Sequence, residues 1–257
     1  MEQNDLIYRN EYKYLVNAAE VEIIKSRANA ILMLDAHVSQ AGTYQGYYNI
    51  RSVYFDDCYD SCYLENENGT DPREKFRIRI YNHSDRKITL ELKRKEHGKC
   101  LKQACPLTRE QCDWLLAGRV LPDSPDHPPL LRKLLLQMKM RSLRPVVIVE
   151  YDRIPYVFPA GNVRITLDLQ ISASNQCQDF FSEDLHLRPI LPENHHVLEV
   201  KWDEVLPDFV CRNLMLERLQ WSNFSKYYLC RKIEKEPYYV CTSKISSKTA
   251  SSMSCLL

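Results

Sequence analysis

Charged residues recur at every second position in several short segments of this sequence. KFRIRIY, residues 75–81, alternates cations with apolar residues, and ITLELKRK, 88–95, and HVLEVKW, 196–202, alternate Glu and Lys with apolar residues. Period two is the period of a β-strand, whose successive side chains point to opposite faces. Each segment is therefore predicted to present one charged face and one apolar face.

A face of arginine and lysine can bind a polyanion. Same-face residues on a strand lie roughly 7 Å apart, and two positive charges at that distance repel by about 2 kcal/mol at an effective dielectric near 20. Phosphate removes this repulsion, because arginine donates bidentate hydrogen bonds to phosphate oxygens and lysine supplies a point charge. Glutamates on the same face could hold Mg²⁺ or Mn²⁺, which prefer oxygen ligands and would bridge phosphates.

A solvated outer face is the simpler interpretation of any one such strand. It is weaker for four or five strands together, because ordinary solvent faces also carry Ser, Thr, Gln and Asn, which are scarce here. If the apolar faces pack outward against helices, the charged faces point inward. A closed or nearly closed barrel would then have a lumen lined with Arg, Lys and Glu.

The elements that would build this barrel can be read from periodicity. Strands are predicted at 9–16, 50–57, 75–81, 88–95, 145–158, 162–169 and 196–202. Helices are predicted after Asn17, from Thr108 to Gly118, over 130–140, and from Asp208 through Gln220. The first two begin at capping-box patterns. Short connections favour antiparallel pairing, so the sequence predicts an α+β protein around one sheet or barrel.

Composition narrows the class of protein. The 257 residues include 35 Lys+Arg and 34 Asp+Glu, so the net charge is only +1 and a protein that coats nucleic acid is not indicated. There is no P-loop motif to hold a nucleotide. Ten cysteines without a CxxC pair are interpreted as reduced thiols, and no apolar run is long enough to span a membrane, so a cytoplasmic location is expected.

Eight pieces of the chain, in order, resemble the VTC-type polyphosphate polymerase domain of the triphosphate tunnel metalloenzyme (CYTH-like) superfamily. They are RNEYKY, IRSVYFD, KFRIRIY, LELKRK, EYDR, VRITLD, VLEVKW and FSKY, within roughly residues 7–230. The resemblance implies an eight-stranded antiparallel β-barrel tunnel wrapped by α-helices. We expect that domain in residues 1–235 and a flexible C-terminal tail in residues 236–257.

The resemblance also implies a reaction, in which the terminal phosphate of ATP is transferred to a growing polyphosphate chain with Mn²⁺ or Mg²⁺. It implies phosphate-binding side chains at Lys13, Arg77, Arg79, Lys93, Arg153, Arg164 and Lys226. Further lining residues would be Arg9, Glu11, Glu91, Lys95 and Lys201. Glu199 would bind the metal, with Glu150 as a second candidate ligand. ATP and polyphosphate would be the partners, and a membrane partner protein is left open.

One departure bears on the direction of the chemistry. The triphosphate-hydrolysing relatives typically begin with ExExK, whereas this chain reads Arg9-x-Glu11-x-Lys13. Arginine there removes a potential metal ligand and adds a potential phosphate ligand, which favours the polymerase. A tunnel-type triphosphatase and a non-catalytic polyphosphate-binding protein remain the alternatives. If Arg77 faces the lumen, Arg77→Ala is expected to leave the fold intact, because it relieves repulsion.

Overall fold

A computed structural model describes residues 8–36, 38 and 46–236 of the chain, and its centre is one antiparallel sheet. Its main path runs β1-β10-β8-β7-β3-β4-β5-β6, with β2 pairing β7 and β9 pairing β8. The strands are β1 (Asn10–Asn17), β2 (Met33–Leu34), β3 (Tyr48–Asp56), β4 (Arg73–Tyr81), β5 (Ser84–Glu96), β6 (Lys99–Leu107), β7 (Arg144–Phe158), β8 (Val163–Ser174), β9 (Arg188–Pro189) and β10 (His195–Trp202). The predicted α+β class with antiparallel strands is confirmed.

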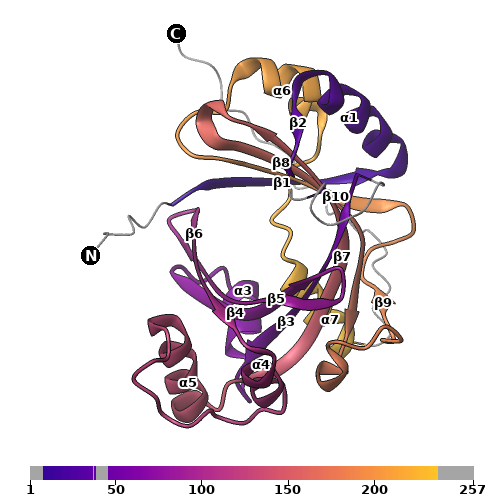
Figure 1. Ribbon diagram of the computed structural model, residues 1–257. Helices are drawn as coiled ribbons and strands as arrows, with labels where there is room; N and C mark the ends of the chain where they lie inside the picture. Colours follow the sequence, from indigo (N-terminus) through magenta and orange to yellow (C-terminus); the bar gives the residue numbers. More distant parts are fainter. Residues whose placement is uncertain (1–7, 37, 39–45, 237–257) are drawn as a thin grey trace.

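The sheet curls until its two edge strands meet. β1 and β6 are joined by one isolated bridge, in which the backbones of Arg9 and Cys100 exchange two hydrogen bonds of 3.0 Å. Right-handed strand twist produces this curvature. The two halves of the sheet therefore face each other across a central space (Figure 1). The predicted eight-stranded barrel is confirmed as a curled sheet that is closed by a bridge rather than by a full ladder.

Six α-helices accompany the sheet in the described part of the chain. They are α1 (Ala18–Ile31), α3 (Ser61–Glu67), α4 (Arg109–Leu116), α5 (Pro129–Arg141), α6 (Asp208–Leu214) and α7 (Lys226–Lys235). Both predicted capping boxes are present, at Asn17 with Glu20 and at Thr108 with Gln111. None of the described helices has the length and apolar character needed to cross a membrane.

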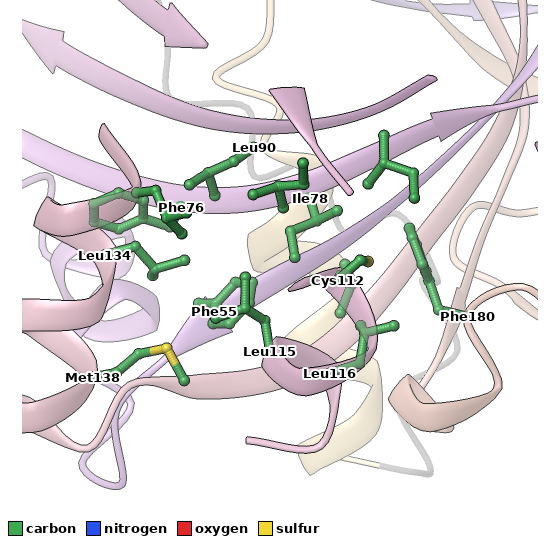
Figure 2. Packing of buried hydrophobic residues seen from close by; sticks show 14 of the residues in the cluster. Phe55, Phe76, Ile78, Leu90, Cys112, Leu115, Leu116, Leu134, Met138 and Phe180 are labelled. Atoms are coloured by element: carbon green, nitrogen blue, oxygen red, sulfur yellow. The ribbon is translucent and has the colours of Figure 1, made fainter. Parts of the chain in front are cut away.

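Two hydrophobic cores lie on the outside of the curl. Under α4 and α5, Phe76 and Ile78 of β4 pack with Leu115 and Leu134 of these helices (Figure 2). A second core joins β1, β8 and β10 to α1 and α6. The apolar faces of the charged strands thus pack outward against helices, as the alternation predicts.

The third core lies inside the curl. Ile50, Val149 and Val197 are buried with Tyr227 and Cys230 of α7. Ile50 and Val149 share the inner face of the sheet, since the strand register pairs Ser52 with both Val149 and Arg79. The prediction that apolar faces point only outward is therefore incomplete, because α7 fills part of the lumen.

Some predicted boundaries are wrong. The helix after Asp208 ends at Leu214 rather than Gln220, because Met215 adopts a left-handed backbone with φ of 54°. Strand β6 and helices α3 and α7 were not predicted, and β6 is the eighth strand that the resemblance implies. The expected tail, 236–257, lies outside the described residues except for Glu236.

Candidate active site

A cavity of about 430 Å³ lies inside the curled sheet and is strongly cationic. Its walls come from β1, β3, β4, β5, β7 and β10, and from the segment that leads into α7. Ten cationic side chains and two carboxylates line it: Lys13, Arg73, Lys75, Arg77, Arg79, Lys93, Lys95, Arg153, Lys201 and Lys226, with Glu11 and Glu199. A chain of net charge +1 thus concentrates positive charge at one place.

The register of β1 and β10 brings the two carboxylates together. Lys13 lies opposite Glu199, and Glu11 lies opposite Lys201, so charges alternate both along and across the strands. The Nζ atom of Lys201 lies 2.7 Å from Glu199 Oε1, and the Nζ atom of Lys93 lies 2.7 Å from Glu11 Oε2. Lys201 Nζ also lies 3.4 Å from Glu11 Oε1, so one ammonium group lies between the two carboxylates.

Both carboxylates are held in the ionised form. Burial raises the pKa of Glu11, but the ammonium groups of Lys13 and Lys93 outweigh it and lower that pKa to about 2. Burial acts in the same way on Glu199, and Lys201 is the largest of the opposing effects that hold its pKa well below the ordinary value. The centre of the cavity therefore carries two negative charges among the cations at neutral pH.

On the opposite wall, Glu91 orients the arginines of β4. Arg77 donates from Nε to Glu91 Oε2 at 2.7 Å and from Nη1 to the Tyr54 hydroxyl at 2.9 Å. Arg79 donates to the Ser52 hydroxyl at 3.0 Å and lies 3.9 Å from Glu91. Glu91 is 2% exposed and lies behind Arg77. It therefore positions a phosphate-binding candidate rather than lining the cavity itself.

Another buried carboxylate, Asp168 of β8, orients Arg153 and Lys226. Arg153 donates two hydrogen bonds to it, at 2.6 and 2.8 Å, and Lys226 lies 2.5 Å away. Arg153 also reaches Glu199 at 3.2 Å. Asp168 was not predicted, although it continues the alternation of Arg164 in VRITLD.

The structure brings most of the predicted site residues to this cavity. Those that line it are Lys13, Arg77, Arg79, Lys93, Arg153, Lys226, Glu11, Lys95, Lys201 and Glu199. Those that do not are Arg9, Glu91, Glu150 and Arg164. Lining residues absent from the predicted site include Arg73, Tyr54, Tyr151, Tyr227 and Trp221. Trp221 is 54% exposed.

The expectation that Arg9 adds a phosphate ligand is wrong for this structure. Its guanidinium donates to Asp203 at 2.7 Å and to the Asn162 carbonyl, away from the cavity. Arg9 precedes β1, at the bridge to Cys100 where the two edge strands meet. The other half of the argument still holds, because no carboxylate occupies this position.

Glu150 and Arg164 also lie elsewhere. Glu150 pairs with Arg51 and with His83, at 3.0 Å, on the opposite face of β7 from Arg153. The two are three residues apart, and such residues cannot share a face of a regular strand. Arg164 forms an ion pair with Asp35, with 2.9 Å between Nη2 and Oδ2. Lys201, its cross-strand neighbour, lines the cavity in its place.

The donor set fits a divalent metal that is shared with bound phosphates. Among the described residues, no group of three or more His, Cys, Asp or Glu is arranged to hold an ion. Glu11 and Glu199 provide two neighbouring ionised carboxylates, and Mg²⁺ is usually held by one or two carboxylates plus substrate phosphates and water. These two residues would therefore hold the metal only together with substrate.

The buried carboxylates should make the fold sensitive to acid. The folded-state pKa values of Glu11, Glu91, Asp168 and Glu199 are all lowered. Their contribution to stability is therefore full above about pH 4.5 and is lost as the pH falls towards 2. We expect the melting temperature to fall across this window, measured by circular dichroism. Glu11→Gln should have a shallower dependence, and an identical slope would contradict the assignment.

Comparisons with known proteins identify one family. The model of the VTC domain family matches residues 8–234. No curated protein matches the chain. Similar solved structures include a protein from Pyrococcus horikoshii, at 17% identity, covering 89% of this chain and 99% of that one, with a TM-score of 0.44. Another is a candidate adenylate cyclase from Bacillus halodurans, at 13% identity, covering 90% and 99%, with a TM-score of 0.47.

A third is a candidate adenylyl cyclase from Hippeastrum described as having a dominant triphosphatase activity. It is 10% identical, covers 88% of this chain and 96% of its own, and has a TM-score of 0.48. The family match spans every wall of the cavity, from β1 to α7. The chain belongs to the VTC domain family.

Proposed function

We propose that this protein is an ATP-dependent polyphosphate polymerase that transfers the terminal phosphate of ATP to a polyphosphate chain. The observation that carries the proposal is the cavity itself, in which ten cations surround two ionised carboxylates inside a VTC-family sheet. Phosphoryl transfer depends mainly on positioning and charge neutralisation. A cationic cavity whose arginines are preorganised by buried carboxylates is suited to both.

The side chains that could bind phosphate lie in two sets on different walls of the cavity. Arg77 and Arg79 present guanidinium groups held by Glu91 and Ser52, so they can donate to phosphate oxygens without first reorganising. Arg153 and Lys226 are held in the same way by Asp168. Glu11 and Glu199 would hold Mg²⁺ or Mn²⁺, which supplies a Lewis acid for the phosphate oxygens when bound.

Transfer to phosphate fits this cavity better than transfer to water. The attacking oxygen of a polyphosphate chain is already anionic and needs no general base. Among the described residues, no histidine lines the cavity, and the lining carboxylates Glu11 and Glu199 are engaged by lysines. A triphosphatase would need one of these groups to activate water. It remains the second candidate, because both reactions use the same phosphate site.

Incubation of the purified protein with ATP and Mn²⁺ tests the proposal. Long-chain polyphosphate and ADP are expected, because the cations can hold donor and acceptor phosphates together. Gel electrophoresis resolves the polymer, and a coupled assay measures ADP. Free orthophosphate without polymer would overturn the proposal in favour of a triphosphatase. Tight polyphosphate binding without turnover under any metal would favour a binding protein.

A further inference from the structure

Lys75 of β4 differs from most of the lining cations, because only neutral groups hold its amine. Its Nζ atom donates to the amide oxygen of Asn66 at 2.8 Å and lies 4.7 Å from the centre of the Tyr227 ring. Seven other lining cations each form an ion pair with Glu11, Glu91, Asp168 or Glu199. In the part of the chain that the structure describes, Lys75 forms none. Its partners thus fix its position without supplying a negative charge.

Other cations face this amine. Lys75 lies directly opposite Lys93 of β5, and Arg73 lies two residues earlier on the same face of β4. Lys13 of β1 also lies near enough to disfavour the charged form of Lys75. Like charges that lie directly opposite each other on a sheet are destabilising. The arrangement therefore favours the loss of a proton from Lys75.

Burial acts in the same direction. Besides the three cations, the titratable groups that face Lys75 come from α3 and α7 and are Cys62, Glu65 and Tyr227. Burial, followed by the charge of Arg73, lowers the pKa of Lys75 to about 7. About half of the Lys75 side chains are then neutral at pH 7, compared with roughly one in 2,500 for a lysine of ordinary pKa.

A neutral amine inside a cationic cavity selects a particular kind of reagent. The amine is a nucleophile that attacks carbonyl carbon, and the cations around it attract phosphate dianions. Arg77 lies two residues after Lys75 on the same face, roughly 7 Å along the strand, and lines the same cavity. An acyl phosphate can reach both groups, because a single oxygen joins its carbonyl carbon to its phosphorus.

We propose that Lys75 is a site of covalent acylation by small acyl phosphates. The neutral amine attacks the carbonyl carbon, so a C–N bond forms and the C–O bond to the phosphate breaks. The phosphate leaves with the electron pair of that bond and takes up the proton that the amine loses. The products are an N-acyl lysine and hydrogen phosphate. Because the amide is uncharged, the reaction removes one cation from the cavity.

Acetyl phosphate is the probe that tests this site. The full chain is incubated with it at pH 7.5, without nucleotide or metal, and the acetylation of each lysine is followed over time by quantitative peptide mass spectrometry. Lys99, an exposed lysine of β6 outside the cavity, is the control within the same molecule. Lys75 should be acetylated at least about tenfold faster than Lys99, because far more of it is neutral. Equal rates at the two lysines would overturn the proposal.

The pH dependence distinguishes a nucleophilic amine from a merely accessible one. The rate at Lys75 should level off above about pH 8, whereas the rate at an ordinary lysine should continue to rise about tenfold per pH unit up to about pH 10. A rate at Lys75 that kept rising over this range would contradict the proposal. Excess tripolyphosphate should protect Lys75 and leave Lys99 unchanged, and a failure to protect would show that the reagent does not react within the cavity.

A substitution beside Lys75 tests the role of its neighbours. Arg73→Gln removes the cation with the largest effect on Lys75 and should lower its acetylation rate at pH 7 about threefold or more. Arg86→Gln, at an exposed arginine of β5 outside the cavity, is the matched control and should react as the wild type does. An unchanged rate in Arg73→Gln would contradict the part assigned to the neighbouring cations.

Selection of the phosphate group can be measured separately. Acetic anhydride carries no phosphate, so its preference for Lys75 over Lys99 should be smaller than that of acetyl phosphate. An equal preference would overturn the choice of acyl phosphates as the reagent. The inference goes beyond the proposed function and does not depend on it, because a protein that makes no polymer from ATP could still be acylated at Lys75.

Discussion

Glu199→Gln is expected to reduce the rate of ATP turnover by about 100-fold or more, the range found when one preorganised electrostatic group is removed from an active site. The substitution keeps the shape of the side chain and removes the negative charge beside Glu11. Glu199 is 4% exposed and is contacted by Lys201 and Arg153. Its loss leaves one carboxylate for the metal, so the Mn²⁺ concentration for half-maximal turnover should rise.

Binding of polyphosphate should survive the same substitution. Removing one negative charge leaves Lys201 and Lys226 less compensated, which favours anions. Calorimetry without metal should therefore show affinity equal to or above that of the wild type. Glu74→Gln is the matched control, since Glu74 lies on the outer face of β4 and pairs with Lys133. If turnover and metal dependence stayed normal in Glu199→Gln, the assignment of Glu199 as a ligand would be wrong.

Arg77→Ala is expected to abolish nucleotide binding and also to destabilise the fold, which revises the expectation from the sequence. Arg77 faces the cavity, as predicted, but it also makes the closest ion pair to the buried carboxylate of Glu91, at 2.6 Å. Removing one partner of a buried ion pair typically costs about 3 kcal/mol or more. For a protein of this size, that corresponds to a fall in melting temperature of roughly 6 °C or more.

The double variant Arg77→Ala/Glu91→Gln separates the two effects. Without Arg77, Glu91 keeps only Lys102, at 3.1 Å, and Arg79, at 3.9 Å, so neutralising Glu91 should restore part of the lost stability. Nucleotide binding should not return, because the guanidinium is still absent. Differential scanning calorimetry and ATP titration measure the two quantities independently. Recovery of ATP binding in the double variant would show that Arg77 acts only by neutralising Glu91.

The prediction that each strand has one charged and one apolar face is correct where the alternation of side chains along the strand (its parity) alone decides which face a residue occupies. Phe76 and Ile78 pack on the outer helices while Arg77 and Arg79 line the cavity, because neighbouring residues on a strand point to opposite faces. The two capping boxes could also be predicted from a local pattern, because each one joins two residues that are three positions apart. Glu150 was wrongly predicted to line the lumen together with Arg153. Applying the alternation of faces would have excluded it, because position 150 lies on the opposite face of the strand from position 153.

Strand parity could not place residues at strand ends or in less regular segments. Arg9 turns to Asp203 and Arg164 to Asp35, although both were expected to line the lumen. The segment of β6, KCLKQACPL, lacks a regular alternation, so its strand was not predicted. Helix α7 was missed in the same region as FSKY, where only the lysine was recognised.

The sequence by itself determined which side chains are cationic and which face of each strand they occupy, because both follow from residue type and a local period of two. Only the tertiary structure decided which cations meet carboxylates. Asp168 reaches Arg153 through the pairing of β7 with β8, and Lys226 reaches Asp168 because α7 packs inside the curl. Among the residues that the structure describes, Arg73, Lys75 and Lys95 form no ion pair with a carboxylate, because the register pairs cation with cation at that end. Register and curvature join residues far apart in the chain, and a local pattern carries no information about that pairing.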